Sequence, residues 1–527
     1  GILATDPSGD AQTLSAVSAM TGIPTSAFGY DLKNATMLLS FGAPLFDGWG
    51  ISGEMNAMRA ARTFKVVQID PRYSRTARQA DEWIAVAPGT EQLAALSIAS
   101  VLIEEKLVSS DIRRSIKDLD RFSSEVKVYP PEKTAESTGI PAAVLRTLAR
   151  ELAHAKAPIV LSGSDPGGGA FDAETERSIA ALNILLGSVK KNGGIVERET
   201  LPGMNAVTVQ QLHSLPDGSI GTLFLDNADS GHVIPWTLIE RKLRKDASLV
   251  VSFSSVLDPL TAHADVLIPA PAPFEMLQEA PQTQTSAVPT FSLSAPLLKQ
   301  NSDTVEPITV LQQLAVRLGI DAGLSESETA LKETARLLHE QKRGTVTSYA
   351  DNSSQAVTEI ASADDLWNTL VAGGIWVGED RKQSAMRPVA FSLHGPNSMT
   401  RNEGLVMLAS GCYGSLHAAQ LSPVMSKMFQ ETELRPVNGM VALSPVTAQQ
   451  YGIVHDGHAV LTTSAGSQKV QIKISPAVRP GILEAAIGPS QNGVETPEHP
   501  SASSLLHLFP VTPDGTWRTT LVTIQKV

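Results

Sequence analysis

The chain has 527 residues, of which 42% are hydrophobic and 18% charged, and its formal net charge at pH 7 is -12. This length exceeds what one hydrophobic core usually supports, so we expect several domains of ordinary globular composition rather than a disordered chain. The acidic balance argues against nucleic acid as the main partner, because phosphate binding needs a basic face.

A single cysteine, Cys412, restricts the metal chemistry of the sequence. Without a second cysteine the chain cannot form an internal disulfide, and by itself it cannot hold a thiolate-bound iron–sulfur cluster or a structural zinc ion. No stretch approaches the roughly 20 apolar residues that a membrane-spanning helix needs. The chain begins with Gly1 and shows no signal peptide, so we expect a processed or trimmed beginning.

The first 150 residues alternate segments typical of buried strands with segments typical of helices. Residues 35–41, 65–69 and 83–86 are short apolar runs that turns containing glycine or proline bring to an end, and residues 91–105 have the pattern of a helix. Strands that alternate with helices predict a parallel sheet with helices over its faces. We therefore assign residues 1–150 to a first α/β domain.

Residues 151–320 repeat the same alternation. A strand at 157–162 runs into the glycine-rich loop 163–169, and a helix follows at 173–186. We assign this region to a second α/β domain with a parallel sheet of its own, so both domains are Rossmann-like. Its further predicted strands and helices lie at 222–225, 248–253, 265–268, 234–245 and 307–318.

Residues 321–385 show a weaker pattern. Helices are predicted at 326–341 and 364–373, and the polar stretch 345–362 between them is expected to be an exposed connector. We treat the region as a connector with helices rather than as a domain with its own sheet.

Residues 386–527 have a different sequence pattern, typical of β-structure. Short alternating strands at 441–443, 458–463 and 468–474 are separated by turn signals such as Asp456-Gly457. Regular short strands with turns of this kind predict a small C-terminal β-barrel domain.

Several turns stand where an open parallel sheet would bind a ligand. Beyond the carboxyl ends of strands, backbone N–H groups and helix N-termini can face a phosphate. Gly42, Asp70 and the loop 163–169 all follow predicted strands, and Asp70 could accept hydrogen bonds from a ribose or a guanine amine. Neither a G-x-G-x-x-G motif nor a P-loop is present. Ordinary turns at strand ends explain these residues equally well.

Two candidates for covalent or acid–base chemistry are isolated residues. Cys412 has His417 nearby in sequence, which permits a catalytic pair, but a lone cysteine is more often a small buried hydrophobe. Glu275 follows a predicted strand and points either into a cleft or to the surface of a loop, and the sequence favours neither.

The histidines are scattered, and no H-E-x-x-H motif occurs. Asp258, His263 and Asp265 lie close together around a turn before a strand, where capping or solvated side chains are the favoured interpretation. His455 and His458 flank a turn, which favours an exposed loop over a metal site.

Taken in order, three segments resemble the molybdopterin oxidoreductase family, which includes dimethyl-sulfoxide reductases, formate dehydrogenases and polysulfide reductases. The strongest match is 66–96, followed by 264–275, which ends in Glu275, and by 438–466 at the opening of the predicted barrel. In 66–96 the residues that fit the family pattern are Asp70, Pro71, Arg72, Thr76, Ala77, Ala80, Asp81, Pro88, Gly89 and Thr90.

The resemblance implies two α/β domains and a double-psi-type β-barrel that, in the family, hold a pair of molybdopterin guanine dinucleotides around molybdenum or tungsten. Carried over by position, the residues expected at one dinucleotide site are Gly42, Asp70, Arg72 and Thr90. Those expected at the other are Ser162, Gly163 and Ser164.

The sequence departs from the family pattern at functional positions. The N-terminal cysteine cluster motif is absent, and only Ser26 or Asp31 stands where the family usually supplies a metal ligand. Glu91 replaces the usual aspartate, and residues 226–229 replace an asparagine–proline turn. These departures favour a member without pterin or metal, whose seven candidate residues are vestigial and which has no active site of its own.

Some membrane quinone-linked complexes, such as menaquinone-reducing complexes and alternative complex III, contain such a subunit of this family. The resemblance therefore implies a non-catalytic scaffold at the periplasmic or extracytoplasmic face of the inner membrane. Its expected partners are an iron–sulfur subunit, a multihaem cytochrome c and an integral membrane quinone-binding subunit, through which any membrane contact would be indirect.

Two alternatives remain open. The first is a catalytic molybdenum or tungsten subunit of polysulfide or tetrathionate reductase type that carries molybdopterin guanine dinucleotide and lacks its N-terminal part. The second is a free-standing nucleotide-binding protein, which leaves the predicted barrel unexplained.

Overall fold

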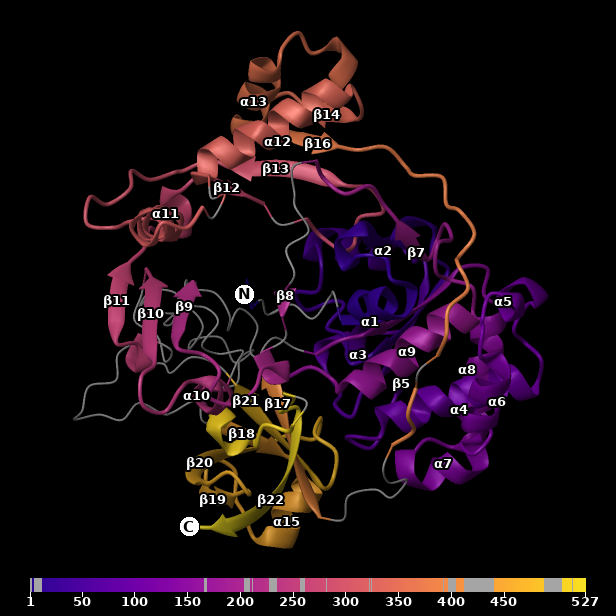
Figure 1. Ribbon diagram of the computed structural model, residues 1–527. Helices are drawn as coiled ribbons and strands as arrows, with labels where there is room; N and C mark the ends of the chain where they lie inside the picture. The colour runs from indigo at the N-terminus through magenta and orange to yellow at the C-terminus, as the bar shows by residue number, and fades with distance from the viewer. Residues whose placement is uncertain are drawn as a thin grey trace.

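The computed structural model describes residues 2–3, 12–164, 168–202, 209–210, 212–226, 235–255, 261–280, 282–321, 323, 325–391, 393–396, 404–411, 440–487, 505–513 and 515–527. These residues form two parallel sheets, an antiparallel sheet with two helices, and a closed barrel (Figure 1). Among them, no helix is long and apolar enough to cross a membrane.

The first sheet has four parallel strands in the order β5-β4-β3-β6. They are β3 (Met37–Phe41), β4 (Lys65–Ile69), β5 (Glu82–Ile84) and β6 (Pro158–Ser162). All five residues of β3 and of β6 are buried, as expected where helices cover both faces of a sheet. The assignment of β6 to a second sheet was wrong, since β6 pairs with β3. A buried apolar run predicts a strand but not its partner.

Two of the helices over this sheet, α4 (Glu91–Glu104) and α9 (Ala173–Leu185), are buried nearly all round. In α4 the run from Glu91 to Leu102 is buried throughout, and α9 is almost as completely covered. A helix that is apolar on all sides belongs in a core rather than at a surface. Also packed around the sheet are α1 (Gln12–Thr21), α2 (Ser52–Ala61), α7 (Pro131–Thr138) and α8 (Ala142–His154).

A side chain of α9 closes the outer edge of β6. Asn183 is fully buried, and its Nδ2 donates to the carbonyl of Val160 at 2.7 Å while its Oδ1 accepts from the N–H of Val160 at 2.9 Å. Both backbone groups of Val160 on the unpaired edge are thereby satisfied, as buried edges require.

A segment late in the sequence packs on the first sheet and its helices, which together form the first α/β body. Val389 and Phe391 are buried in the same core, and the ring of Phe391 lies 4.5 Å from that of Phe122. The N–H of Phe391 donates to Asp118 at 2.8 Å, and Gln92 donates to the carbonyl of His394 at 2.8 Å. This segment begins the region that we assigned to the barrel domain, yet it packs on the first α/β body.

The second parallel sheet has three strands in the order β11-β10-β9. The strands β9 (Thr222–Asp226), β10 (Leu249–Ser254) and β11 (Val266–Pro269) confirm the three predicted for this region. Helix α10 (Trp236–Lys242) packs its buried Ile239 against this sheet, and α11 (Pro307–Leu318) lies near β11 (Figure 1).

Residues 345–362 are not the exposed connector that we predicted. They contain β14 (Thr345–Thr347) and β15 (Ser354–Ala356), which belong to a five-stranded antiparallel sheet of order β12-β13-β16-β14-β15. Val346 and Val357 are buried there under two helices. Strands of three residues with polar ends are too short to show a periodic pattern. The remaining elements of this lobe are β12 (Gln278–Glu279), β13 (Thr290–Ser294), β16 (Ile375–Val377), α12 (Ser327–Gln341) and α13 (Ala363–Val371).

The predicted C-terminal barrel is confirmed. Six strands close in the order β17-β21-β18-β20-β19-β22, with parallel pairing of β17 with β21 and of β18 with β20. Alternate residues of β19 and β22 are buried, which is the pattern that a small barrel imposes. The strands are β17 (Leu405–Gly411), β18 (Met440–Leu443), β19 (His458–Thr462), β20 (Ser467–Ile474), β21 (Ile482–Ile487) and β22 (Thr519–Lys526).

Replacing Asn183 tests the closure of the β6 edge. Asn183→Leu preserves the volume but leaves the N–H and C=O of Val160 unpaired. Because each buried unpaired backbone group costs roughly 1–3 kcal/mol, we expect the opening free energy of peptides spanning β6 and α9 to fall by about 2–4 kcal/mol. Hydrogen exchange with mass spectrometry measures this. Asn368→Leu, an exposed position on α13, serves as the matched control, and equal effects of the two variants would contradict the assignment.

Candidate functional site

The seven candidate residues lie at the carboxyl ends of β3, β4 and β6, or at the helix beside them. Phe41 stands level with Ile69 on one side and with Ser162 on the other, so the three strands end together. The N–H of Gly42 donates to Ile69 at 3.0 Å and that of Gly163 donates to Phe41 at 3.1 Å. Residues that we placed at two separate sites therefore meet at one edge of one sheet. Their roles toward a cofactor remain a prediction.

Asp70 is fully engaged within the chain. Its carboxylate accepts from the N–H of Arg72 at 2.8 Å and from Nε2 of Gln68 at 3.3 Å. Its carbonyl accepts from the indole of Trp83 at 2.9 Å. The side chain is 1% exposed, so it acts as a buried turn-former, while Arg72 lies alongside with its Nε 3.9 Å from the carboxylate.

Thr90 and Ser162 are also satisfied internally. The hydroxyl of Thr90, at the start of α4, donates to the carbonyl of Ala87 at 2.7 Å. The hydroxyl of Ser162 donates to Glu176, and Ser162 N–H donates to the Thr13 hydroxyl at 2.7 Å. Ser164 is buried directly after Gly163. The candidate hydroxyl groups of Thr90 and Ser162 thus already serve the fold.

The site includes one residue that our sequence reasoning missed, Arg518 of the barrel. Its Nη1 donates to the carbonyl of Gly163 at 3.1 Å, and its guanidinium centre lies 3.8 Å from the centroid of the Phe171 ring. Gly42 has φ +70°, and a Cβ there would lie 2.5 Å from Nη2 of Arg518. A side chain at position 42 would force the guanidinium to shift and would strain the backbone at this φ. An isolated arginine near the end of the chain, just before β22, carries no local sequence signal of this role.

Two buried carboxyl groups face Arg518 from the helices. Burial raises the pKa of Glu176 to about 7, although the bond from Ser162 and the charge of Arg518 act in the opposite direction. Burial also raises the pKa of Glu91, again against the charge of Arg518. The protonation of this edge therefore changes near neutral pH.

The unpaired buried atoms around this edge test whether a nucleotide cofactor fits. Within the described residues, the side-chain atoms of these segments that lack a hydrogen-bond partner are the amide oxygens Gln12 Oε1 and Gln68 Oε1, the carboxyl oxygens Glu91 Oε1 and Glu176 Oε1, and the donor Trp49 Nε1. A pyrophosphate offers acceptors only and needs N–H or cationic donors. The strand-end N–H groups of Gly42 and Gly163 are already used, and Arg518 is bound to Gly163. The described residues do not fit a pyrophosphate here.

Neither residue that stood in place of the family's metal ligand points to a metal. The carboxylate of Asp31 accepts from Nδ2 of Asn34 at 2.9 Å and from the N–H of Gly193 at 2.7 Å, which locks a turn. The carbonyl of Ser26 accepts from the buried Arg198 at 3.3 Å. In the described part of the chain, no group of three or more His, Cys, Asp or Glu residues could hold a metal ion.

The other candidates have local structural roles. Glu275 accepts from the N–H of Ala272 at 3.0 Å and closes a single turn. His263 stacks on Trp236 with ring centroids 4.1 Å apart, and Asp265 accepts from the N–H of Val250 at 2.8 Å. His455 accepts from the N–H of a barrel residue at 3.0 Å. Outside the described residues lie Cys412, His417, Asp258 and the predicted turn at 227–229.

Comparison with known proteins agrees with this architecture. The family described as molybdopterin oxidoreductase matches residues 4–288. The menaquinone reductase, molybdopterin-binding-like subunit of Nitratidesulfovibrio vulgaris is 27% identical over 526 residues, which cover 94% of this chain and 72% of that protein. The thiosulfate reductase molybdopterin-containing subunit of Salmonella typhimurium is 30% identical over 34% of this chain and 24% of its own length. Acetylene hydratase from Pelobacter acetylenicus shares the fold with a TM-score of 0.72, 15% identity, and coverage of 98% of this chain and 81% of its own.

The raised pKa of Glu176 predicts a pH-dependent stability. The folded pKa of about 7 lies above the ordinary value of 4.5, so the folded state binds this proton more tightly between those values. Wild-type stability therefore falls as pH rises through this window, by about 3 kcal/mol from this group. Glu176→Gln, which cannot titrate, should gain stability relative to wild type by about that amount between pH 4.5 and pH 8 in urea unfolding. The exposed Glu136→Gln should show no such trend, and a constant difference for Glu176→Gln would refute the interpretation.

A second prediction concerns the contact from the barrel. Arg518→Met leaves the carbonyl of Gly163 without its donor and removes the positive charge beside Glu91 and Glu176. We expect a loss of about 2–4 kcal/mol at pH 8 and a smaller loss at pH 5, where Glu176, whose pKa burial raises to about 7, is protonated. Urea unfolding at the two pH values measures both losses. Arg387→Met, at an exposed arginine, should leave the free energy of unfolding nearly unchanged. A loss of stability in Arg518→Met that is the same at both pH values would exclude the electrostatic contribution of Arg518.

Proposed function

This chain belongs to the molybdopterin oxidoreductase family, and we propose that it is a non-catalytic scaffold subunit of a membrane-attached, quinone-linked respiratory electron-transfer complex. The similarity to a menaquinone reductase subunit runs through 94% of the chain and therefore includes the barrel as well as the α/β body. The similarity to the thiosulfate reductase subunit covers about a third of it.

The observation that carries the proposal concerns the edge of the first sheet where β3, β4 and β6 end, here called the strand-end edge. Its polar groups are already bonded within the chain. Arg518 covers Gly42 and Gly163, and the hydroxyl or carboxylate groups of Asp70, Thr90 and Ser162 are bonded within the chain. A nucleotide pyrophosphate would have to displace an arginine that two buried carboxyl groups attract, and would then meet mainly acceptors. We infer that this chain carries no molybdopterin guanine dinucleotide and that Gly42, Asp70, Arg72, Thr90, Ser162, Gly163 and Ser164 now serve packing.

A scaffold of this kind passes no electrons itself. With one cysteine in 527 residues, the chain has no set of thiolates for an iron–sulfur cluster, so current must flow through partner chains. The partners that we propose are an iron–sulfur subunit, a multihaem cytochrome c and an integral membrane quinone-binding subunit. We place the chain peripherally on the periplasmic or extracytoplasmic face of the inner membrane, in contact with the bilayer only through those partners.

The competing function is a catalytic subunit of polysulfide or tetrathionate reductase type. The 30% identity to a thiosulfate reductase molybdopterin-containing subunit favours it over one third of the chain. In that case the same seven residues would line a molybdopterin guanine dinucleotide with molybdenum or tungsten, and Arg518 would have to move away from Gly163.

The content of the purified native complex distinguishes these functions. We expect elemental mass spectrometry to find neither molybdenum nor tungsten, and fluorescence of oxidised pterin to find no pterin, in a preparation that retains quinone chemistry. A molybdenum-containing enzyme of the family, purified in parallel, is the control for loss of the cofactor during purification. Stoichiometric metal with pterin would sink the scaffold proposal and make this chain the catalytic subunit.

A further inference from the structure

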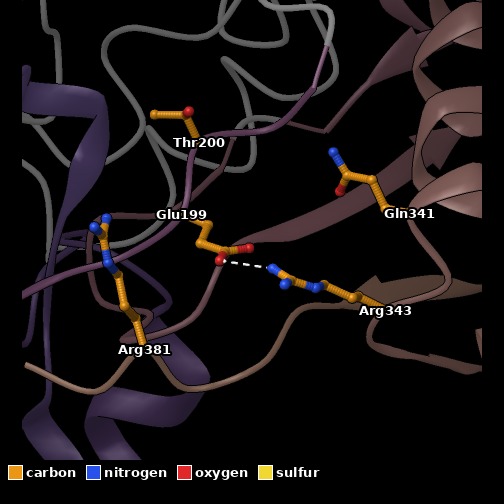
Figure 2. A pocket seen from close by; sticks show the side chains of 5 residues that line it. All are labelled: Glu199, Thr200, Gln341, Arg343 and Arg381. Carbon is orange, nitrogen blue, oxygen red and sulfur yellow. Dashed lines mark hydrogen bonds and ion pairs between the residues drawn. The ribbon is translucent and has the colours of Figure 1, made fainter.

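A pocket of about 570 Å³ lies between the first α/β body and the antiparallel lobe. Figure 2 shows its lining, which comes from three segments far apart in the sequence. Glu199 and Thr200 follow β7 (Ile195–Glu197), Gln341 and Arg343 stand at the end of α12, and Arg381 follows β16. None of these residues belongs to the strand-end edge, so the pocket is a separate feature.

The two arginines are held in place from outside the pocket. Arg381 pairs with Glu197 at 2.9 Å, and that carboxylate is fixed in turn by Lys190 at 2.6 Å. The carbonyl of Arg343 accepts from the indole of Trp376 at 3.0 Å. The next residue, Gly344, has φ +79°, and a Cβ there would lie 2.5 Å from the carbonyl of Val377. This close approach fixes the backbone that carries Arg343.

Donors outnumber acceptors in the pocket. Each guanidinium has five N–H donors, of which one group on Arg381 is paired with Glu197 and one on Arg343 donates to Glu199 at 3.1 Å. The hydroxyl of Thr200 and the amide of Gln341 form no hydrogen bond with any other residue that the structure describes. Among the five described lining residues, Glu199 alone contributes a carboxylate.

We propose that this pocket binds a small molecule bearing two oxyanion groups, phosphate or carboxylate. Figure 2 places Arg343 and Arg381 on opposite sides of Glu199, so each guanidinium can meet one group of such a ligand. Guanidinium groups match oxyanions with paired, charge-assisted hydrogen bonds. The volume lies in the range of small-molecule sites. The inference does not depend on the scaffold proposal.

The carboxylate of Glu199 occupies the position on Arg343 that we assign to one oxyanion group of the ligand. Its carboxylate bonds Arg343 as an oxyanion of the ligand would. The side chains of this pair are 48% and 58% exposed, and an ion pair so exposed contributes little, so its displacement costs little.

Calorimetric titration of the purified chain with pyrophosphate tests the site. We expect saturable binding that weakens about tenfold in Arg343→Ala and in Arg381→Ala, and that strengthens several-fold in Glu199→Gln, because the internal competitor is gone. Acetate, which carries one oxyanion group, should bind at least about tenfold more weakly than pyrophosphate, and succinate should compete with pyrophosphate.

Arg336→Ala is the matched control, since this exposed arginine lies on α12, the helix that ends just before Arg343, and among the described residues it pairs with Glu333 and Glu340. Its affinity for pyrophosphate should equal that of wild type. The gain in Glu199→Gln cannot arise from misfolding, so it protects the test against unstable variants. Absence of saturable binding, equal losses in Arg343→Ala and Arg336→Ala, or weaker binding in Glu199→Gln would each overturn the proposal.

Discussion

The rest of the structure depends on how the common end of β3, β4 and β6 is closed. Three buried parallel strands stop at one level, and a guanidinium from the barrel covers two of the three ends. The positive charge of Arg518 offsets part of the desolvation of Glu91 and Glu176, whose pKa values burial raises. Arg518 is therefore one of the residues that join the last domain to the first, and its charge acts on both carboxyl groups beside it.

This closure connects the architecture to the proposed function. A parallel sheet usually offers its carboxyl edge to a ligand. Here Asp70, Thr90 and Ser162 direct their polar atoms to the chain itself, and the buried atoms left unpaired around them are mostly acceptors. The family fold is retained while polar groups of its edge bond within the chain, as the proposed scaffold function requires.

Much of the fold could be predicted because buried strands, helix patterns and barrel turns are local signals. Those signals identified β3, β4, β9, β10 and three of the six barrel strands, β18, β19 and β20, and the family motif identified the edge through Asp70 and Thr90. They could not show that β6 pairs with β3, nor that Arg518 reaches Gly163 across 355 positions, because neither contact leaves a periodic trace. The short strands of 345–362 failed for a related reason, since three residues show no period.

The return of Val389 and Phe391 to the first body has a consequence for biosynthesis. The core around Phe122 lacks part of its packing until Phe391 has left the ribosome, after the second parallel sheet and the antiparallel lobe have been made. The intervening sheets must therefore fold as insertions while an apolar surface of the first body waits uncovered. Slow closure of so distant a contact exposes nascent chains to aggregation. Cells that make this protein should accordingly depend on chaperones during its translation.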